Sequence, residues 1–497
     1  MSDITKYTIT SLKQKLNNKE ISATELTKLY LDKIKQINSE LNAYILSTEE
    51  IALKSAAISD QNIANGSAKL LEGIPLGIKD NFCTKNIKTR CASHILDNFI
   101  PPYESTVTQN LWNNGAILLG KLNMDEFAMG SANITSFYGP TVNPIIAKDS
   151  DKKLVPGGSS GGSAAAVCAN LCVAAIGSDT GGSIRQPASF TALTGLKPTY
   201  GRCSRLGLIA FASSLDQAGP ISKNVTDNAL MLNAIAGYDP QDSTSKNIAM
   251  EDFTKDLNKN IKGLKIGIPK EYQLNGVDQA VTKSWENAAN TLESLGAEII
   301  DISLPHTEYA APTYYIISTA EASSNLARYD GVRYGLRVSD QGDSLNDLYI
   351  KTRSQGFGNE VKRRIMVGTY VLSSGYYDAY YKKAQKLRRL ISQDFDSAFK
   401  KVDAILTPTT PNTAFAIDEK PTTLEMYHND IFTVSANLTG LPAISIPAGL
   451  NKKHLPLGVQ LISPLFSETL LYRIAKNLEE ALEFNHDQLN YRITLDL

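Results

Sequence analysis

The chain has 497 residues, of which 42% are hydrophobic and 20% are charged. This composition is typical of a folded globular protein and excludes a disordered chain. The net charge of −1 also argues against a protein that binds nucleic acid mainly through its own surface, because such proteins are usually basic. If nucleic acid takes part in the function, we expect a partner subunit to hold most of it.

Cysteine content and the N-terminal sequence indicate a cytoplasmic protein. Five cysteines in a chain of this length are too few for a disulfide framework, which fits a reducing compartment. Cys168 and Cys172 lie four residues apart, but no histidine or second cysteine pair stands beside them. We therefore expect buried thiols there rather than a metal site. The N-terminus lacks the apolar core of a signal peptide, and no apolar run is long enough to predict a membrane-spanning helix.

The first 70 residues are predicted to form helices. Residues 22–25 read Ser-Ala-Thr-Glu, which is a capping box, and apolar side chains then recur at helical spacing as far as Ile37. After this part, short apolar runs bounded by glycine predict buried strands at residues 74–78, 117–119 and 173–176.

Strands and helices alternate in the second half as well. A helix at residues 278–295, ended by Gly296, lies between strands at 264–268 and 298–302 and completes a βαβ unit. Later strands are predicted at 402–406, 443–446 and 457–462, with a final helix at 469–482. This alternation predicts the α/β class. We expect one domain, residues 1–497, in three parts (1–70, 71–238 and 239–497), and place the boundary between halves in the polar segment 239–258.

A serine at a glycine-rich turn is the first candidate catalytic residue. The strand predicted at 173–176 leads into Asp-Thr-Gly-Gly-Ser at residues 179–183, and the next residues can begin a helix. Two consecutive glycines allow backbone N–H groups to converge on one point, and a helix N-terminus favours negative charge. Ser183 would then be a nucleophile beside an oxyanion hole, formed by Thr180, Gly181, Gly182 and Ser183. The turn by itself fits a helix cap equally well.

A second turn reads Gly-Gly-Ser-Ser-Gly-Gly-Ser at residues 157–163 and continues directly into a small-residue helix. A flexible linker would not lead straight into such a helix, and the lysine of a phosphate-binding P-loop is missing. We therefore expect Ser159 to be held rigidly by its glycines and to pass a proton.

Lys79 ends the apolar run at residues 74–78, where a strand would bury it. The alternative is a surface lysine paired with Asp80. A buried lysine can act as a base, because burial disfavours the ammonium form and would lower its pKa from about 10.4 toward 7. None of the five histidines lies in either glycine–serine turn, so a Ser-His-Asp triad has little support.

Lys79 and the two turns together resemble the amidase signature family, whose members use a Ser-cisSer-Lys triad to hydrolyse amides. The resemblance implies that Ser183 is the nucleophile that forms an acyl ester, Ser159 the relay serine and Lys79 the general base. It also implies a cis peptide between Gly158 and Ser159. The fold expected from the family is a large mixed β-sheet flanked by helices on both faces.

Further segments resemble one branch of this family, the glutaminase subunits of tRNA-dependent amidotransferases. These segments are residues 124–131, 214–220, 322–326, 328–331 and 357–364. The resemblance implies glutamine as substrate and a heterotrimer with partner subunits B and C. Ammonia would pass to the partner, which amidates Glu-tRNA(Gln) or Asp-tRNA(Asn) with ATP. Since this chain shows no metal or nucleotide motif, we expect no cofactor on it and assign ATP and Mg²⁺ to the partner.

The same resemblance places recognition of glutamine at Arg363 and Asp430, with Tyr314 nearby. An arginine fork suits the substrate carboxylate, and a carboxylate suits its ammonium. Without the resemblance, Arg363 would belong to a solvated charge run and Asp430 would cap a helix. Two alternatives stay open: a stand-alone amidase for aryl or aliphatic amides, and a scaffold subunit without turnover, against which the intact triad argues.

Overall fold

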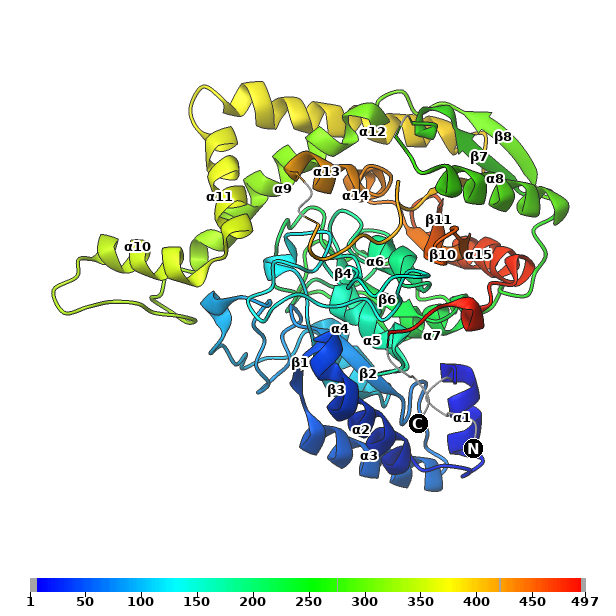
Figure 1. Cartoon of the computed structure of the whole chain (residues 1–497), viewed down its shortest axis with the longest axis horizontal. Coiled ribbons are helices and arrows are strands. Elements are labelled where there is room, and N and C mark those ends of the chain that lie inside the picture. Colours follow the sequence, from blue (N-terminus) through cyan, green and yellow to red (C-terminus); the bar gives the residue numbers. More distant parts are fainter. Residues whose placement is uncertain (1–6, 275, 420–421, 493–497) are drawn as a thin grey trace.

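The computed structural model describes residues 7–274, 276–419 and 422–492. Its strands form one 11-stranded sheet in the order β1-β3-β2-β4-β6-β5-β10-β11-β9-β7-β8 (Figure 1). The strands are β1 Tyr44–Ser47, β2 Pro75–Lys79, β3 Ile117–Leu122, β4 Ala174–Asp179, β5 Thr194–Lys197, β6 Gln217–Ser222, β7 Lys265–Pro269, β8 Glu298–Ile302, β9 Ala404–Pro408, β10 Ala443–Leu450 and β11 Pro456–Ile462.

Fifteen α-helices accompany the sheet in the described residues. They are α1 Ile9–Asn17, α2 Ala23–Leu41, α3 Glu49–Ala64, α4 Thr106–Asn113, α5 Gly161–Cys168, α6 Arg185–Phe190, α7 Val225–Ile235, α8 Gln279–Ser294, α9 Ala310–Asn325, α10 Leu345–Gly356, α11 Asn359–Leu372, α12 Lys383–Ala398, α13 Thr423–His428, α14 Val434–Thr439 and α15 Glu468–Leu482. Short 3₁₀ turns and one π-helical turn, Tyr377–Lys382, complete the secondary structure.

The sheet is mixed, which confirms the expected fold. β2 is parallel to β3 and β4, and β7 is parallel to β8 and β9. Between these two parts of the sheet, the neighbouring pairs β4–β6, β6–β5, β5–β10, β10–β11 and β11–β9 are antiparallel. Every residue of β2, β3, β4 and β6 is buried. Since successive side chains of a strand point to opposite faces, helices and loops must cover both faces of the sheet.

Most predicted elements are present, and the N-terminal part contains one error. Ser22 caps α2 with the predicted capping box, in which Ser22 and Glu25 bond to each other's backbone N–H. The first 70 residues, however, are not all helical, because β1 lies between α2 and α3 and pairs antiparallel with β3. A four-residue edge strand is too short to show an alternating pattern, and pairing with β3 rather than local sequence decides its conformation.

The sheet joins the two halves of the chain. β5 pairs with β10, so strands from residues 71–238 and from residues 239–497 lie side by side. The polar segment at residues 239–258 falls between α7 and β7, where the chain forms neither helix nor strand. The division of the chain into three parts remains a prediction.

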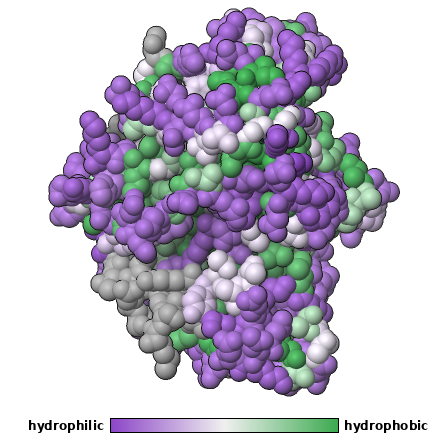
Figure 2. All heavy atoms as spheres, turned by 90° about the vertical axis from the view of Figure 1, so that its right-hand side faces the viewer, coloured by the Kyte–Doolittle hydropathy of each residue, from purple (hydrophilic) through white to green (hydrophobic). Residues whose placement is uncertain are grey.

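Helices α9, α11 and α12 pack together beside the sheet, whereas α10 projects to the left of them in Figure 1 and packs against the short turn at His94–Leu96. α9 packs against α11, α12 and the short α14. The face in Figure 2 is largely hydrophilic, with hydrophobic residues in scattered clusters. Across the described ranges, every helix is too short or too polar to cross a membrane.

Candidate active site

Lys79 is the last residue of β2 and is fully buried, as the sequence predicted. Its Nζ donates to three serine hydroxyls: Ser159 Oγ at 2.7 Å, Ser160 Oγ at 2.9 Å and Ser178 Oγ at 2.9 Å. Burial lowers the pKa of Lys79 to about 7, although the negative charges of Asp125 and other carboxylates oppose the change. At neutral pH a large fraction of the amine is therefore uncharged and able to accept a proton.

The relay turn lies directly against Lys79. The peptide between Gly158 and Ser159 is cis, as the family resemblance implied. Gly158 N–H donates to Gln186 Oε1 at 2.9 Å, and Asp125 N–H donates to the Ser159 carbonyl at 3.2 Å. A side chain at residue 158 is excluded, because a Cβ there would lie 2.1 Å from Asp125 Oδ2. These contacts fix the backbone on both sides of Ser159, and its part in proton transfer stays a prediction.

The nucleophile turn connects β4 to α6, which confirms the predicted strand–turn–helix. Ser160 N–H donates to the Ser183 carbonyl at 3.2 Å, so the two glycine–serine turns lie against each other. Gly182 has a φ of +132°, and a Cβ there would lie 2.3 Å from Thr433 Oγ1. The position therefore requires glycine on both conformational and steric grounds.

The oxyanion hole needs one correction. The N–H of Gly182 is already engaged, because it donates to Asp179 Oδ1 at 2.8 Å. The N–H groups of Thr180, Gly181 and Ser183 have no acceptor among the residues that the structure describes, and they remain the proposed donors. The Thr180 side chain is fixed separately, since its hydroxyl donates to Asp216 Oδ1 at 2.6 Å.

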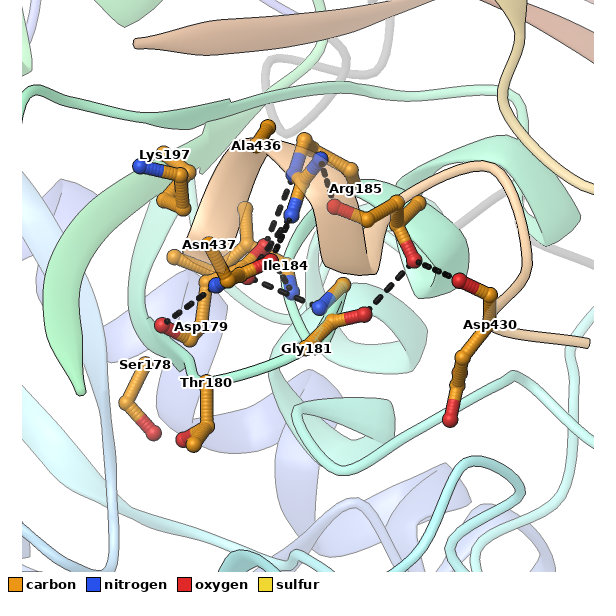
Figure 3. A network of polar contacts seen from close by, with 12 residues as sticks. Ser178, Asp179, Thr180, Gly181, Ile184, Arg185, Lys197, Asp430, Ala436 and Asn437 are labelled. Atoms are coloured by element: carbon orange, nitrogen blue, oxygen red, sulfur yellow. Dashed lines mark hydrogen bonds and ion pairs between the residues drawn. The ribbon is translucent and has the colours of Figure 1, made fainter. Parts of the chain in front are cut away.

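A buried ion pair, which the sequence reasoning missed, supports the nucleophile turn (Figure 3). Arg185 donates Nε and Nη2 to the two carboxylate oxygens of Asp179, each at 3.0 Å, and both side chains are fully buried. Burial alone would raise the pKa of Asp179, but the charge and hydrogen bonds of Arg185, with a bond from Asn437, hold it well below its usual range. Asp179 also accepts the N–H groups of Gly182 and Ile184, which flank Ser183.

Asp430 and Tyr314 lie next to the nucleophile turn, as predicted. The Tyr314 ring packs on Gly181, where a Cβ would lie 2.5 Å from the ring. Thr433 Oγ1 bonds to the carbonyls of both Gly181, at 2.6 Å, and Asp430, at 3.0 Å. Burial raises the pKa of Asp430 to about 7, against the hydrogen bond that Tyr315 Oη donates to Asp430 Oδ2 at 2.8 Å.

Arg363, on α11, is half-exposed and joins this group through a tyrosine. Its Nε and Nη2 bond to the carboxylate of Glu360, while Nη1 donates to Tyr427 Oη at 2.7 Å. The Tyr427 ring stacks on Tyr315 with ring centroids 3.5 Å apart. The sequence reasoning named neither tyrosine, although Tyr315 follows Tyr314 directly and Tyr427 precedes Asp430 by less than one helical turn.

The comparisons with known proteins agree with this geometry. A family model described as amidase matches residues 25–472. The chain belongs to the amidase family. A curated relative from Bartonella henselae, the A subunit of glutamyl-tRNA(Gln) amidotransferase, is 59% identical over 97% of this chain and 98% of its own length.

Solved structures of the amidase family have the same fold. The A subunit of glutamyl-tRNA(Gln) amidotransferase from Thermotoga maritima is 40% identical, with a TM-score of 0.79 and 98% of each chain covered. The peptide amidase from Stenotrophomonas maltophilia is 30% identical, with a TM-score of 0.81, and 97% of this chain and 98% of that one are covered. The amidase fold thus serves both a component of a larger enzyme and an amidase that acts on peptides.

Proposed function

We propose that this chain is the glutamine-hydrolysing subunit of a cytoplasmic tRNA-dependent amidotransferase. The observation that carries the proposal is the contact of buried Lys79 Nζ with Ser159 Oγ, next to the turn that bears Ser183. Support for the substrate comes from two side chains, Arg363 and Asp430, that are linked to this turn through packed tyrosines and Thr433. Relatives that are A subunits of glutamyl-tRNA(Gln) amidotransferases support it as well.

The reaction follows from the placement of these groups. Neutral Lys79 takes a proton from Ser159, which takes the proton of Ser183, while Ser183 Oγ forms a bond to the amide carbon of glutamine. Thr180, Gly181 and Ser183 N–H groups stabilise the negative oxygen of the tetrahedral intermediate, each donor contributing about 3–4 kcal/mol. The proton returns through Ser159 to the departing nitrogen, the C–N bond breaks, and ammonia leaves a γ-glutamyl ester on Ser183. Water then cleaves the ester by the same proton route and releases glutamate.

Ammonia would be used by partner subunits B and C of a heterotrimer, which hold the tRNA and use ATP and Mg²⁺ to convert Glu-tRNA(Gln) to Gln-tRNA(Gln). Asp-tRNA(Asn) is the second substrate class that the sequence resemblance implied. No step in glutamine hydrolysis itself requires a cofactor on this chain.

The test is to purify the full chain with candidate partner subunits and to measure glutamate release and tRNA amidation with glutamine as nitrogen donor. We expect Ser183→Ala to abolish glutamate release while ammonium chloride still supports amidation, since the partner site is intact. A Ser183→Ala protein that still releases glutamate at the normal rate would exclude the proposed nucleophile.

A stand-alone amidase for aryl or aliphatic amides is the competing function. Arg363→Ala separates the two, because only an enzyme that binds the glutamine carboxylate should lose turnover of glutamine and keep turnover of a neutral amide such as butyramide. Unchanged turnover of both amides would favour the stand-alone amidase, in which Arg363 has no role in binding.

A further inference from the structure

A stacked pair of tyrosines connects the two predicted ends of the substrate site. Tyr315 belongs to α9 and Tyr427 to α13, and their rings lie 24° from parallel with centroids 3.5 Å apart. Each hydroxyl serves a different end: Tyr427 Oη contacts Arg363, and Tyr315 Oη contacts Asp430. The pair therefore fixes the carboxylate-binding end relative to the ammonium-binding end.

The hydrogen bonds of Arg363 leave Tyr427 with a proton to donate. Glu360 occupies the Nε and Nη2 edge of the guanidinium, in a side-on pair with distances of 2.6–3.0 Å. Arginine is only a donor, so Tyr427 Oη accepts from Nη1 and keeps its own proton. Within the part of the chain that the structure describes, this phenol proton has no acceptor. A carboxylate placed at the Nη1 edge of Arg363 would accept it.

The hydroxyl of Tyr315 contacts Asp430. Tyr315 Oη donates to Asp430 Oδ2, which leaves Oδ1 for a ligand and favours the charged carboxylate. Arg364, which is nearly fully buried, lies over the Tyr315 ring at 5.8 Å and bonds to Glu360 through Nε. Glu360 therefore orients both arginines, and the tyrosine stack packs against the same cluster.

We propose that Tyr427 is a further substrate-binding residue, whose hydroxyl donates to the α-carboxylate of glutamine together with Arg363, and that Tyr315 is a positioning residue for Asp430 at the ammonium. This inference rests on the proposed glutaminase function. The stack sets the distance between the two binding groups, so that an amide with both an α-ammonium and an α-carboxylate makes both sets of contacts. An amide that lacks one of these charges loses one set.

The experiment compares Tyr427→Phe and Tyr315→Phe in the full chain with its partner subunits, because phenylalanine removes the hydroxyl and retains the stack. Three amides are used: glutamine, glutaramate, which lacks the ammonium, and 4-aminobutanamide, which lacks the carboxylate. A hydrogen bond to a charged group corresponds to a change of roughly 10- to 100-fold.

We expect Tyr427→Phe to reduce kcat/KM by that factor for glutamine and glutaramate and to leave 4-aminobutanamide unchanged. Tyr315→Phe should instead affect glutamine and 4-aminobutanamide and spare glutaramate. Where turnover of an analogue is too slow to measure, its inhibition constant against glutamine gives the same comparison. Tyr370→Phe is the control, because Tyr370 lies on α11 with Arg363 but is 48% exposed and outside the site.

Equal losses for all three amides, or no loss in Tyr427→Phe, would overturn the inference. If the proposed glutaminase function itself is wrong, the result is distinguishable, because the wild-type protein would then not prefer glutamine over either analogue. A wild-type preference for glutamine that Arg363→Ala abolishes, with both phenylalanine variants behaving like wild type, would refute the tyrosine assignment alone.

Discussion

Buried Lys79, which we assign as the base, should make the folded protein less stable at neutral pH than at alkaline pH. Replacing this lysine by an apolar residue should therefore stabilise the protein at neutral pH. Burial lowers the pKa of Lys79 from 10.5 to about 7. Between these pH values the unfolded chain binds a proton that the folded chain does not, so stability rises with pH across this window. At about 1.4 kcal/mol per pKa unit, the shift of about 3.5 units lowers the free energy of unfolding by about 5 kcal/mol at pH 7.

Lys79→Met removes this penalty and also removes the hydrogen bonds to Ser159, Ser160 and Ser178. If each of the three lost bonds costs about 0.5–1 kcal/mol, the variant should be more stable than wild type by about 2–3.5 kcal/mol at pH 7. The difference should shrink as the pH rises and should be reversed near pH 10.5, where the folded-state lysine is neutral and the unfolded-state lysine is only half protonated. The lost hydrogen bonds then outweigh the small charge penalty that is left.

Urea unfolding at pH 7, 8.5 and 10 measures the effect, with Lys401→Met as the matched control because Lys401 is exposed. The m-values of wild type and variant should agree, so that midpoints can be compared. A Lys79→Met protein less stable than wild type at pH 7, or a gain that does not change with pH, would refute the reasoning that burial sets the charge of this amine.

Three further predictions concern catalysis and the nucleophile turn. The pH profile of kcat/KM for glutamine should fall on the acid side with a midpoint near pH 7, about tenfold per pH unit, because protonated Lys79 cannot accept a proton; a profile flat down to pH 5 would contradict this. Asp179→Asn should lower the free energy of unfolding by about 3–5 kcal/mol and abolish glutamate release, since it leaves the buried Arg185 charge unpaired; urea unfolding checks the magnitude. Gly181→Ala should destabilise the protein by about 1–3 kcal/mol, because its Cβ would lie 2.5 Å from the Tyr314 ring. A Gly181→Ala/Tyr314→Ala double variant should recover part of this loss, whereas strictly additive effects of the two substitutions would count against the clash.

Local sequence was sufficient where neighbouring residues decide the conformation. The capping box at Ser22 and the strand–turn–helix around Ser183 follow from contacts within a few residues of each other. β7, α8 and β8 were predicted because they are consecutive elements with clear local patterns, although the two strands pair over a longer distance in the chain. β1, β5 and β6 were not predicted. They are short or interrupted by glycine and proline, and their extended conformation depends on pairing with strands far away in the chain.

The site shows the same division. The sequence indicated Lys79, Ser159 and Ser183, because glycine turns and a lysine at the end of a buried strand are local patterns. It did not indicate which groups support them, since Arg185 bonds to Asn437 from the far half of the chain and Tyr427 bonds to Arg363 from another helix. These contacts depend on the tertiary packing of helices and strands that are far apart in the sequence.

The amino-acid sequence by itself determined the chemical groups of the site, which are an amine, two hydroxyls and the glycine turns that carry the hydroxyls. Only the tertiary structure decided how that chemistry is tuned. Full burial of Lys79 lowers its pKa, Arg185 keeps Asp179 charged, and Asp179 takes the Gly182 N–H that sequence reasoning had given to the oxyanion hole. The physical reason is that desolvation and hydrogen-bond partners depend on which distant segments surround a group, and those segments come together only when the sheet is complete.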